Sequence, residues 1–229
     1  IDFSCHKGQK IAVIGSTGSG KSTLVKLMNR FYDVSRGSIE INGVDIRKYN
    51  LESLRTQIGY VAQKAHMFKG SIQSNICFGK PEASVEEMVH AATVAQASDF
   101  ISTREHGYED EIAEDGTNIS GGQKQRLSIA RVILKKPSLY IYDDSFSALD
   151  FKTDATLRKA LKPEVKNAIF FVVAQRISTI MDSDMIIVLD EGQIIGMGTH
   201  AQLLKDCSVY QEIAHSQLTQ KELDDYERN

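Results

Sequence analysis

The stretch Gly15-Ser16-Thr17-Gly18-Ser19-Gly20-Lys21-Ser22 constrains the fold of this chain more than any other feature of its sequence. It has the spacing G-x-x-x-x-G-K-[ST], which is typical of a phosphate-binding loop when it joins a strand to a helix. A buried strand is predicted by the apolar residues 11–14, and a helix by residues 23–30. Because both flanks are present, a chance glycine-rich turn is a poor explanation. The sequence therefore predicts a P-loop that binds a nucleotide.

The residue types within this P-loop suit a polyphosphate. Its glycines let backbone N–H groups approach phosphate oxygens without Cβ clashes, and the start of the helix adds a partial positive charge. Lys21 is expected to reach the β- and γ-phosphates, and the Ser22 hydroxyl is expected to ligate Mg²⁺.

Charge, cysteine content and hydropathy exclude several classes of protein. The formal net charge of −3 over 229 residues produces no overall field that would attract nucleic acid or an anionic membrane. Cys5, Cys77 and Cys207 are odd in number and widely spaced, which disfavours a disulfide framework or a zinc site and fits a reducing compartment. The longest apolar run, residues 169–174, is too short to span a membrane, and no signal peptide opens the chain. Since the chain starts abruptly at Ile1, close to the P-loop strand, we expect it to have been cut from a longer polypeptide.

Strands alternate with helices along the rest of the chain, which predicts an α/β fold with a mostly parallel sheet around the P-loop. Ligands of such sheets bind at the carboxyl ends of the strands, where the P-loop and the pair Asp143-Asp144 are expected to lie. The expected strands after the first are residues 58–62, 139–142, 169–174, 185–189 and 194–195. The expected helices after the first are residues 85–100, 120–136, 155–161 and 201–217.

Two smaller units are expected beside this P-loop NTPase core. Residues 37–46 alternate apolar and polar side chains on both sides of Asn42-Gly43, which predicts a small antiparallel β subdomain with a type I′ turn. A helical subdomain is expected as an insert at about 64–136, with a polar, glycine-punctuated loop at 105–118. Residues 220–229 are expected to form a frayed or solvated tail.

The stretch Ser120-Gly121-Gly122-Gln123 is a second candidate phosphate site. Its S-x-x-Q spacing is that of a capping box, and an ordinary helix N-cap accounts for it equally well. Two glycines at an exposed helix start also offer unpaired N–H groups to an anion. The chain thus has two phosphate-type sites but a single P-loop lysine. At the end of the strand 139–142, Asp143 supplies a strand-end carboxylate, for which a helix cap is the ordinary structural explanation.

Several motifs, in this order along the chain, resemble those of the nucleotide-binding domain of ABC transporters. They are Gly15–Ser22, Gln63, Ile119-Ser120-Gly121-Gly122-Gln123-Lys124-Gln125-Arg126, Tyr140–Asp144, Ser147-Ala148-Leu149-Asp150 and Gln175. The resemblance covers almost the whole chain, and the Ser-Gly-Gly-Gln signature between the P-loop and the Asp143 strand is highly specific. Residues 67–76 further resemble ABC exporters, in which a transmembrane domain precedes this domain in the same polypeptide.

The resemblance implies a head-to-tail dimer that holds two ATP molecules, each between the P-loop of one domain and the signature of the other. Mg²⁺ would be held by Ser22, Gln63 and, through water, Asp143, and Gln63 would also report the state of the site to the transmembrane helices. Asp150 would lie at the dimer interface. The nucleotide-binding residues that the resemblance implies are Gly15, Ser16, Thr17, Gly18, Ser19, Gly20, Lys21, Ser22, Thr23, Gln63, Ser120, Gly121, Gly122 and Gln123.

The catalytic candidates are Lys21, Asp144 and Gln175, and the last two depart from the pattern of the family. The family usually has Glu after the metal-binding Asp, as general base, and His near the γ-phosphate. The Asp carboxylate is one methylene shorter and falls back by about 1.5 Å, whereas a base must lie within about 2.6–3.2 Å of its proton. An amide can hydrogen-bond a phosphate but cannot carry the positive charge of an imidazolium. Both changes affect one site, which predicts ATP binding with slow turnover.

These features favour the degenerate-site subunit of a heterodimeric exporter of the multidrug type, at the cytoplasmic face of the cell membrane. Its signature would complete the active site of an unlike partner subunit, which keeps Glu and His and has an altered signature of its own. Two alternatives stay open: a regulatory module that binds ATP and dimerises without useful hydrolysis, and a soluble ABC ATPase acting on DNA or ribosomes. The net charge of −3 does not support a nucleic-acid partner. A nucleotide kinase is disfavoured because it needs no Ser-Gly-Gly-Gln signature.

Overall fold

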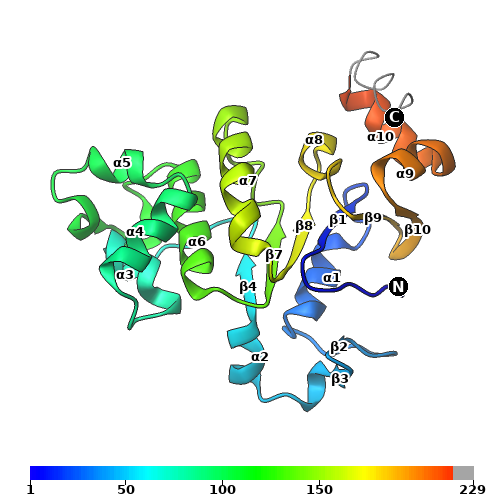
Figure 1. Ribbon diagram of the computed structural model, residues 1–229, viewed down its shortest axis with the longest axis horizontal. Helices are drawn as coiled ribbons and strands as arrows, with labels where there is room; N and C mark the ends of the chain where they lie inside the picture. Colours follow the sequence, from blue (N-terminus) through cyan, green and yellow to red (C-terminus); the bar gives the residue numbers. More distant parts are fainter. Residues whose placement is uncertain (219–229) are drawn as a thin grey trace.

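The computed structural model describes residues 1–218 of the chain. The core of this part is a six-stranded sheet with the strand order β10-β9-β1-β8-β7-β4 (Figure 1). All neighbouring strands are parallel except β10, which is antiparallel to β9. The strands are β1 (Lys10–Ile14), β4 (Ile58–Val61), β7 (Leu139–Asp143), β8 (Ile169–Val173), β9 (Met185–Asp190) and β10 (Gln193–Gly198). The expected α/β fold with a mostly parallel sheet is therefore confirmed.

The apolar side chains of the strands divide between the two faces of the sheet. In β1, Ile11 and Val13 pack on one face, Ala12 and Ile14 pack on the other, and all four are buried. The parallel register places Ile11 opposite Phe171 of β8, whose side chain packs on the same face. A parallel sheet is covered on both faces, so its strands need nearly unbroken apolar runs. That requirement explains why the central strands were recognisable as short apolar segments.

Helices cover both faces of the sheet. Helices α1 and α2 pack against one face, α6, α7 and α8 pack against the other, and α10 packs on α8 and α9 (Figure 1). Within residues 1–218, no helix combines the length and the apolar character needed to cross a bilayer. The helices outside the segment between β4 and β7 are α1 (Lys21–Met28), α2 (Leu51–Gln57), α7 (Phe151–Val165), α8 (Ile177–Ile180), α9 (His200–Asp206) and α10 (Ser208–Gln217).

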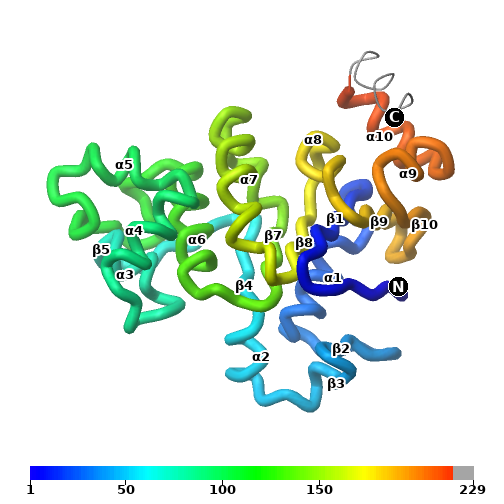
Figure 2. Tube along the Cα trace, in the orientation of Figure 1, coloured from blue at the N-terminus to red at the C-terminus, as the bar shows by residue number. Residues whose placement is uncertain are grey.

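A small antiparallel hairpin lies beside α1 and α2, at the bottom of the view in Figure 2. It consists of β2 (Glu40–Ile41) and β3 (Val44–Asp45), and a 3₁₀ turn leads from it toward α2. The φ angles of Asn42 and Gly43 are 53° and 75°. Two consecutive left-handed residues are what a type I′ turn requires, so the predicted hairpin and its turn type are confirmed.

Between β4 and β7 the chain forms a group of helices on the β4 side of the sheet, drawn in green at the left of Figure 1. Its strands β5 and β6 pair antiparallel, with Gly70 opposite Ile112. Strand β6 falls within residues 105–118, which were expected to be a loop, and two 3₁₀ turns lie there as well. The elements of this segment are β5 (Gly70–Ser71), α3 (Ile72–Ile76), α4 (Val85–Val94), α5 (Ser98–Ser102), β6 (Glu111–Ile112) and α6 (Gly121–Lys135), with 3₁₀ turns at Cys77–Gly79, Gly107–Glu109 and Glu114–Gly116.

Two expected helices are each divided in the structure. Residues 85–100 form α4 and α5, because Gln96 adopts a left-handed φ of 58° between them. Residues 201–217 form α9 and α10, separated by Cys207, which is extended and buried. At both breaks the packing of the tertiary structure overrides helix propensity, which is a weak preference. The tail expected at residues 220–229 lies outside the described residues.

Helix α7 extends beyond the expected residues 155–161 in both directions. Asp150 caps its start by accepting hydrogen bonds from the backbone N–H (2.9 Å) and the hydroxyl (2.7 Å) of Thr153. The buried apolar side chains of α7 are Leu157 and Leu161, so the apolar pattern marked only the middle of the helix.

Candidate functional site

The P-loop joins β1 to α1, as the sequence predicts. Gly18 and Gly20 have left-handed φ angles of 86° and 104°, which glycine adopts without strain. Gly20 occupies the N-cap of α1 and supplies no side-chain hydrogen bond to the helix start. The first N–H groups of α1 therefore point into the loop without a side-chain cap, an arrangement suited to an anion. Ser16, Thr17, Ser22 and Thr23 are all exposed on this loop and the first turn of α1.

Gly15 is the position at which the loop passes closest to the sheet. A Cβ at this residue would lie 2.1 Å from the carbonyl oxygen of Leu189 at the end of β9 and 2.8 Å from Ser19 Oγ. The backbone N–H of Gly192 donates to the Ser19 carbonyl at 3.0 Å, which holds the loop against the following turn. Glycine is needed at this position for a close backbone approach.

Lys21 folds back over the P-loop. Its Nζ donates to the carbonyl oxygens of Gly15 (2.8 Å) and Ser16 (2.7 Å), and lies 3.3 Å from Ser19 Oγ. Burial lowers the pKa of Lys21, while the negative charges of two nearby carboxylates oppose that shift. A phosphate would offer this ammonium charged acceptors, which form stronger hydrogen bonds than neutral carbonyl oxygens.

Asp143 ends β7 and is 6% exposed. Its Oδ2 accepts a hydrogen bond from the Tyr60 hydroxyl at 3.2 Å, and it caps no helix. Burial raises the pKa of Asp143, and burial together with the Asp143 charge raises the pKa of Tyr60 to about 12. Tyr60 was not expected at the site. The sequence of its strand does not indicate that the Tyr60 hydroxyl lies next to Asp143.

Asp144 follows β7 and is hydrogen-bonded to residues at the ends of β4 and β8. Its φ is 47°, a left-handed value unusual for a residue with a side chain, and its N–H donates to the Val173 carbonyl at 2.9 Å. Its carboxylate Oδ2 accepts from Gln63 Nε2 at 3.0 Å and from Gln175 Nε2 at 2.8 Å. Burial raises the pKa of Asp144, the hydrogen bond from Gln63 opposes this, and the neighbouring Asp143 charge adds to it. Three residues expected at one site, Gln63, Asp144 and Gln175, thus meet at the carboxyl ends of β4, β7 and β8.

The signature begins helix α6. Ser120 Oγ accepts from the Gln123 backbone N–H at 3.2 Å, and Gln123 Oε1 accepts from the Ser120 N–H at 2.9 Å. The capping-box interpretation is therefore correct. A Cβ at Gly121 would have no neighbour within 4 Å, so nothing inside the chain requires glycine there. The buried Gln125 donates to the Ala62 carbonyl at 3.1 Å and joins α6 to the residue before Gln63.

The donor groups at the expected metal site are chemically suited to Mg²⁺. Ser22, Gln63 and Asp143 supply hydroxyl, amide and carboxylate oxygens, and Mg²⁺ prefers hard oxygen ligands. Residues 1–218 contain no group of three or more His, Cys, Asp or Glu side chains arranged to hold a metal ion. A Mg²⁺ ion here would therefore depend on nucleotide phosphates and water for much of its coordination.

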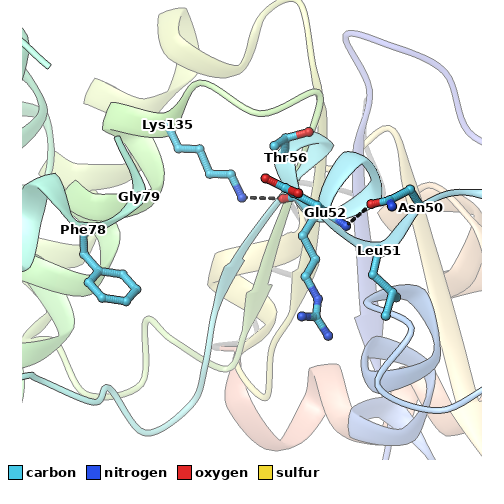
Figure 3. Close-up of a pocket in the computed structure, with 8 residues that line it drawn as sticks. Asn50, Leu51, Glu52, Thr56, Phe78, Gly79 and Lys135 are labelled. Atoms are coloured by element: carbon cyan, nitrogen blue, oxygen red, sulfur yellow. Dashed lines mark hydrogen bonds between the residues drawn. The ribbon is translucent and has the colours of Figure 1, made fainter. Parts of the chain in front are cut away.

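A separate open groove of about 830 Å³ lies between α2, the 3₁₀ turn Cys77–Gly79 and Lys135 at the end of α6 (Figure 3). Lys135 spans it by donating to the carbonyl oxygens of Arg55 and Ile58. The exposed ring of Phe78 forms part of its wall, stacked on Phe68 at 4.3 Å between ring centroids. None of the P-loop or signature residues lines this groove.

Comparisons with known proteins agree with the motifs. Residues 1–147 match the family model described as ABC transporter. An uncharacterized ABC transporter ATP-binding protein of Mycobacterium tuberculosis is 44% identical over 220 residues, which are 95% of this chain and 38% of that protein. YgaD of Bacillus subtilis, which carries the name "Putative multidrug export ATP-binding/permease protein", is 45% identical over 93% of this chain and 37% of its own length.

A solved structure shares the fold as well as the sequence pattern. A bacterial Atm1-family ABC exporter with ATP bound superposes with a TM-score of 0.89 at 38% identity, covering 91% of this chain and 37% of that chain. The present chain thus spans well under half the length of these relatives. With the P-loop, the signature and the Asp143 strand in their expected order on the expected sheet, this chain belongs to the ABC transporter family and is an ATP-binding domain of that family.

Proposed function

We propose that this chain is the ATP-binding domain of an ABC exporter, and that it binds Mg-ATP at the edge of the sheet formed by the ends of β1, β8, β7 and β4. The observation that carries this proposal is the meeting of Gln63, Asp144 and Gln175 within the electrostatic reach of Lys21. The names of the relatives, which include an ATP-binding/permease protein and an ABC exporter, support the same function.

In this proposal, residues Gly15–Thr23 surround the phosphates through backbone N–H groups, and Lys21 exchanges loop carbonyls for the β- and γ-phosphates. Ser22, Gln63 and Asp143 would hold Mg²⁺, which supplies charge neutralisation on the phosphates when it is bound. Tyr60 would hold the Asp143 carboxylate in place through the hydrogen bond at 3.2 Å.

We further propose that the chain works in a head-to-tail dimer, in which Ser120, Gly121, Gly122 and Gln123 face the nucleotide of the partner. The exposed Gly121, for which the chain itself has no steric need, supports a contact made from outside. Asp150, already engaged as the cap of α7, would lie at the same interface.

Matched substitutions of two capping serines test the role of the signature. Ser84 and Ser120 each close a capping box, with Glu87 and Gln123 respectively. Replacing either serine by alanine should cost a similar stability, about 1 kcal/mol, because the same kind of hydrogen bond is lost. Only Ser120→Ala should also lower steady ATP turnover of the full complex, by about tenfold, since a hydrogen bond to a charged phosphate would be lost as well. Equal turnover in the two variants, at equal thermal stability, would contradict a phosphate contact at Ser120.

We propose that the site around Lys21 hydrolyses ATP slowly. Asp144 stands where a longer carboxylate would serve as base, and its Oδ2 is occupied by two amide donors. Burial still raises the pKa of Asp144 despite the hydrogen bond from Gln63, so the slow turnover is attributed to the short reach of the carboxylate and not to weak basicity. Gln175 remains neutral at all pH values, so it cannot place a positive charge near the γ-phosphate. The rapid site would then be the one on an unlike partner subunit, completed by the signature of this chain.

The slow-site proposal predicts unequal effects of two substitutions in the full complex. Asp144→Asn should leave steady ATP turnover within about twofold, whereas Glu→Gln at the base position of the partner should lower it by about 100-fold or more. ATP hydrolysis by the purified complex is the measurement. A tenfold loss of turnover in Asp144→Asn would contradict the proposal that the site around Lys21 is the slow one. Turnover that persists without the partner's carboxylate would contradict it as well.

We infer that a transmembrane domain belongs to the same polypeptide. The ATP-binding domain would then lie at the cytoplasmic face of the membrane, and residues 64–136 would form the helical subdomain of the ATP-binding domain. Several hydrophobic spans of about 20 residues before Ile1 in the native polypeptide would support an exporter. Their absence would favour a soluble ABC ATPase.

A second candidate function is a regulatory module that binds ATP and dimerises without useful hydrolysis. It is favoured by the two hydrogen bonds that the Asp144 carboxylate already accepts from Gln63 and Gln175. Undetectable ATP turnover with the partner present would support this alternative.

A further inference from the structure

The last residue of helix α10 is hydrogen-bonded to the loop that carries Gln175. The Gln217 side chain accepts from the backbone N–H of Ile177 through Oε1 at 2.9 Å. Its Nε2 donates to the backbone carbonyl oxygen of Gln175 at 2.8 Å. One side-chain amide therefore pairs with a donor and an acceptor two residues apart, as a neighbouring strand would. The two segments that it joins are about 40 residues apart in the sequence.

Helix α10 is firmly attached to the body of the domain. Tyr210 and Ala214 are completely buried in the same cluster as the sheet, and the Tyr210 hydroxyl lies 2.6 Å from His200 Nδ1 of α9. Gln211 of the same helix donates to the carbonyl oxygens of Leu204 and Lys205, at 2.8 and 3.2 Å. Gln217 thus extends from a helix whose position is set by core packing.

The loop held by Gln217 has fixed points on either side of Gln175. Before it, the Ala174 N–H donates to the carbonyl of Val13, which lies in β1 two residues before the P-loop, at 3.1 Å. After it, Ile177 is completely buried and begins α8. The Gln175 side chain leaves this short connection to reach Asp144. An anchor at both Gln175 and Ile177 therefore restricts the backbone from which the Gln175 amide is aimed.

We propose that Gln217 is a positioning residue for the nucleotide site: by holding the backbone of residues 175–177, it keeps the Gln175 amide directed at Asp144 and the γ-phosphate. This inference rests on the proposed function of Gln175. It makes the docked helix α10 a requirement for recognition of the third phosphate of ATP, although Gln217 itself would touch no nucleotide. Fixing the loop before the nucleotide arrives removes part of the ordering cost of binding.

The test uses the full-length protein in its purified complex, with the variants Gln217→Ala, Gln175→Ala and Gln211→Ala. Gln211→Ala is the matched control, because it removes two similar hydrogen bonds between α10 and α9 and leaves residues 175–177 untouched. Amide hydrogen exchange of peptides covering 174–180 reports the state of the loop. Photolabelling of this chain by 8-azido-ATP, in competition with Mg-ATP or Mg-ADP, reports nucleotide affinity separately from the partner.

For Gln217→Ala we expect faster exchange of the Ile177 amide and a loss of Mg-ATP affinity of about three- to tenfold, as for one or two partly exposed hydrogen bonds. Mg-ADP affinity should stay within about twofold, since ADP lacks the γ-phosphate. Gln175→Ala should weaken Mg-ATP binding similarly, and the double variant should be no weaker than the single ones, because the two residues act through one another. Gln211→Ala should leave both affinities unchanged.

The possible failures are distinguishable. If Gln175→Ala weakens Mg-ATP binding but Gln217→Ala does not, or if Gln217→Ala weakens Mg-ATP and Mg-ADP equally, the positioning role of Gln217 is wrong while the role of Gln175 stands. Unchanged exchange of the Ile177 amide in Gln217→Ala overturns the inference as well. If Gln175→Ala leaves the preference for ATP over ADP intact, the proposed role of Gln175 fails first, and the inference falls with it.

Discussion

Lys21→Ala is expected to weaken Mg-ATP binding at the P-loop of this chain by about 10- to 150-fold. Hydrogen bonds to charged groups contribute about 1.5–3 kcal/mol, and each 1.4 kcal/mol corresponds to a factor of ten. The ammonium of Lys21 is partly desolvated, so its interaction with a phosphate is screened less than that of a surface lysine. Without it, the backbone N–H groups of the loop and the start of α1 would remain as anion ligands.

A second lysine provides the control for this measurement. Lys48 is exposed in the 3₁₀ turn after β3, and Lys48→Ala changes the net charge by the same amount. Equilibrium binding of Mg-ATP should be unchanged in Lys48→Ala and reduced in Lys21→Ala. Similar affinities for the two variants would mean that the nucleotide does not bind at the P-loop. The loop structure itself should survive, because the Gly192 N–H still donates to the Ser19 carbonyl and the Ser19 N–H to the Ser16 carbonyl without Lys21.

Gly15→Ala is expected to be the most damaging single substitution in the P-loop, with a loss of folding stability of about 3 kcal/mol and loss of nucleotide binding. The added methyl group would lie 2.1 Å from a backbone carbonyl oxygen of Leu189. A side chain could rotate away from such a contact, whereas the end of β9 is held by its pairing with β1 and β10. The loop would have to move away from the sheet, and its phosphate-facing N–H groups would move with it.

The contrasting substitution is Gly121→Ala, in the signature. A Cβ there meets no atom within 4 Å, so the stability of the chain should change by no more than about 0.5 kcal/mol. Thermal unfolding of both variants, alongside Mg-ATP binding, measures the difference. A Gly15→Ala protein that unfolds at the temperature of the unsubstituted chain would refute the steric argument.

Much of the site could be predicted from the sequence because its signals are local. Three patterns depend only on neighbouring residues: the P-loop spacing, the apolar run before it and the Asn42-Gly43 turn. Each correctly predicted the local structure, namely the loop between β1 and α1, the strand β1 and the β2–β3 hairpin. The mostly parallel direction of the strands followed from the alternation of strands and helices, whereas their order in the sheet did not. Gln63 and Asp144 were assigned to one site through a family pattern, and their side chains do meet.

Other features had no local signal. Gln96 breaks a helix whose composition favours continuation, and the hydroxyl of Tyr60 reaches Asp143, 83 residues away in the sequence. The contact of Gln217 with residues 175–177 was likewise absent from any short-range pattern. Each of these depends on which elements lie side by side after the sheet has formed.

The amino-acid sequence by itself determined that this protein is a P-loop α/β domain and where along the chain its candidate phosphate-binding residues lie, because glycine geometry and apolar periodicity act over a few residues. Only the tertiary structure decided how those residues are aimed. The left-handed turn of Asp144, its two amide partners and the anchor at the end of α10 result from the ends of separate strands and a distant helix being brought together by core packing. Contacts between residues that are far apart in the chain depend on that packing, because they form only when the elements that carry them lie side by side.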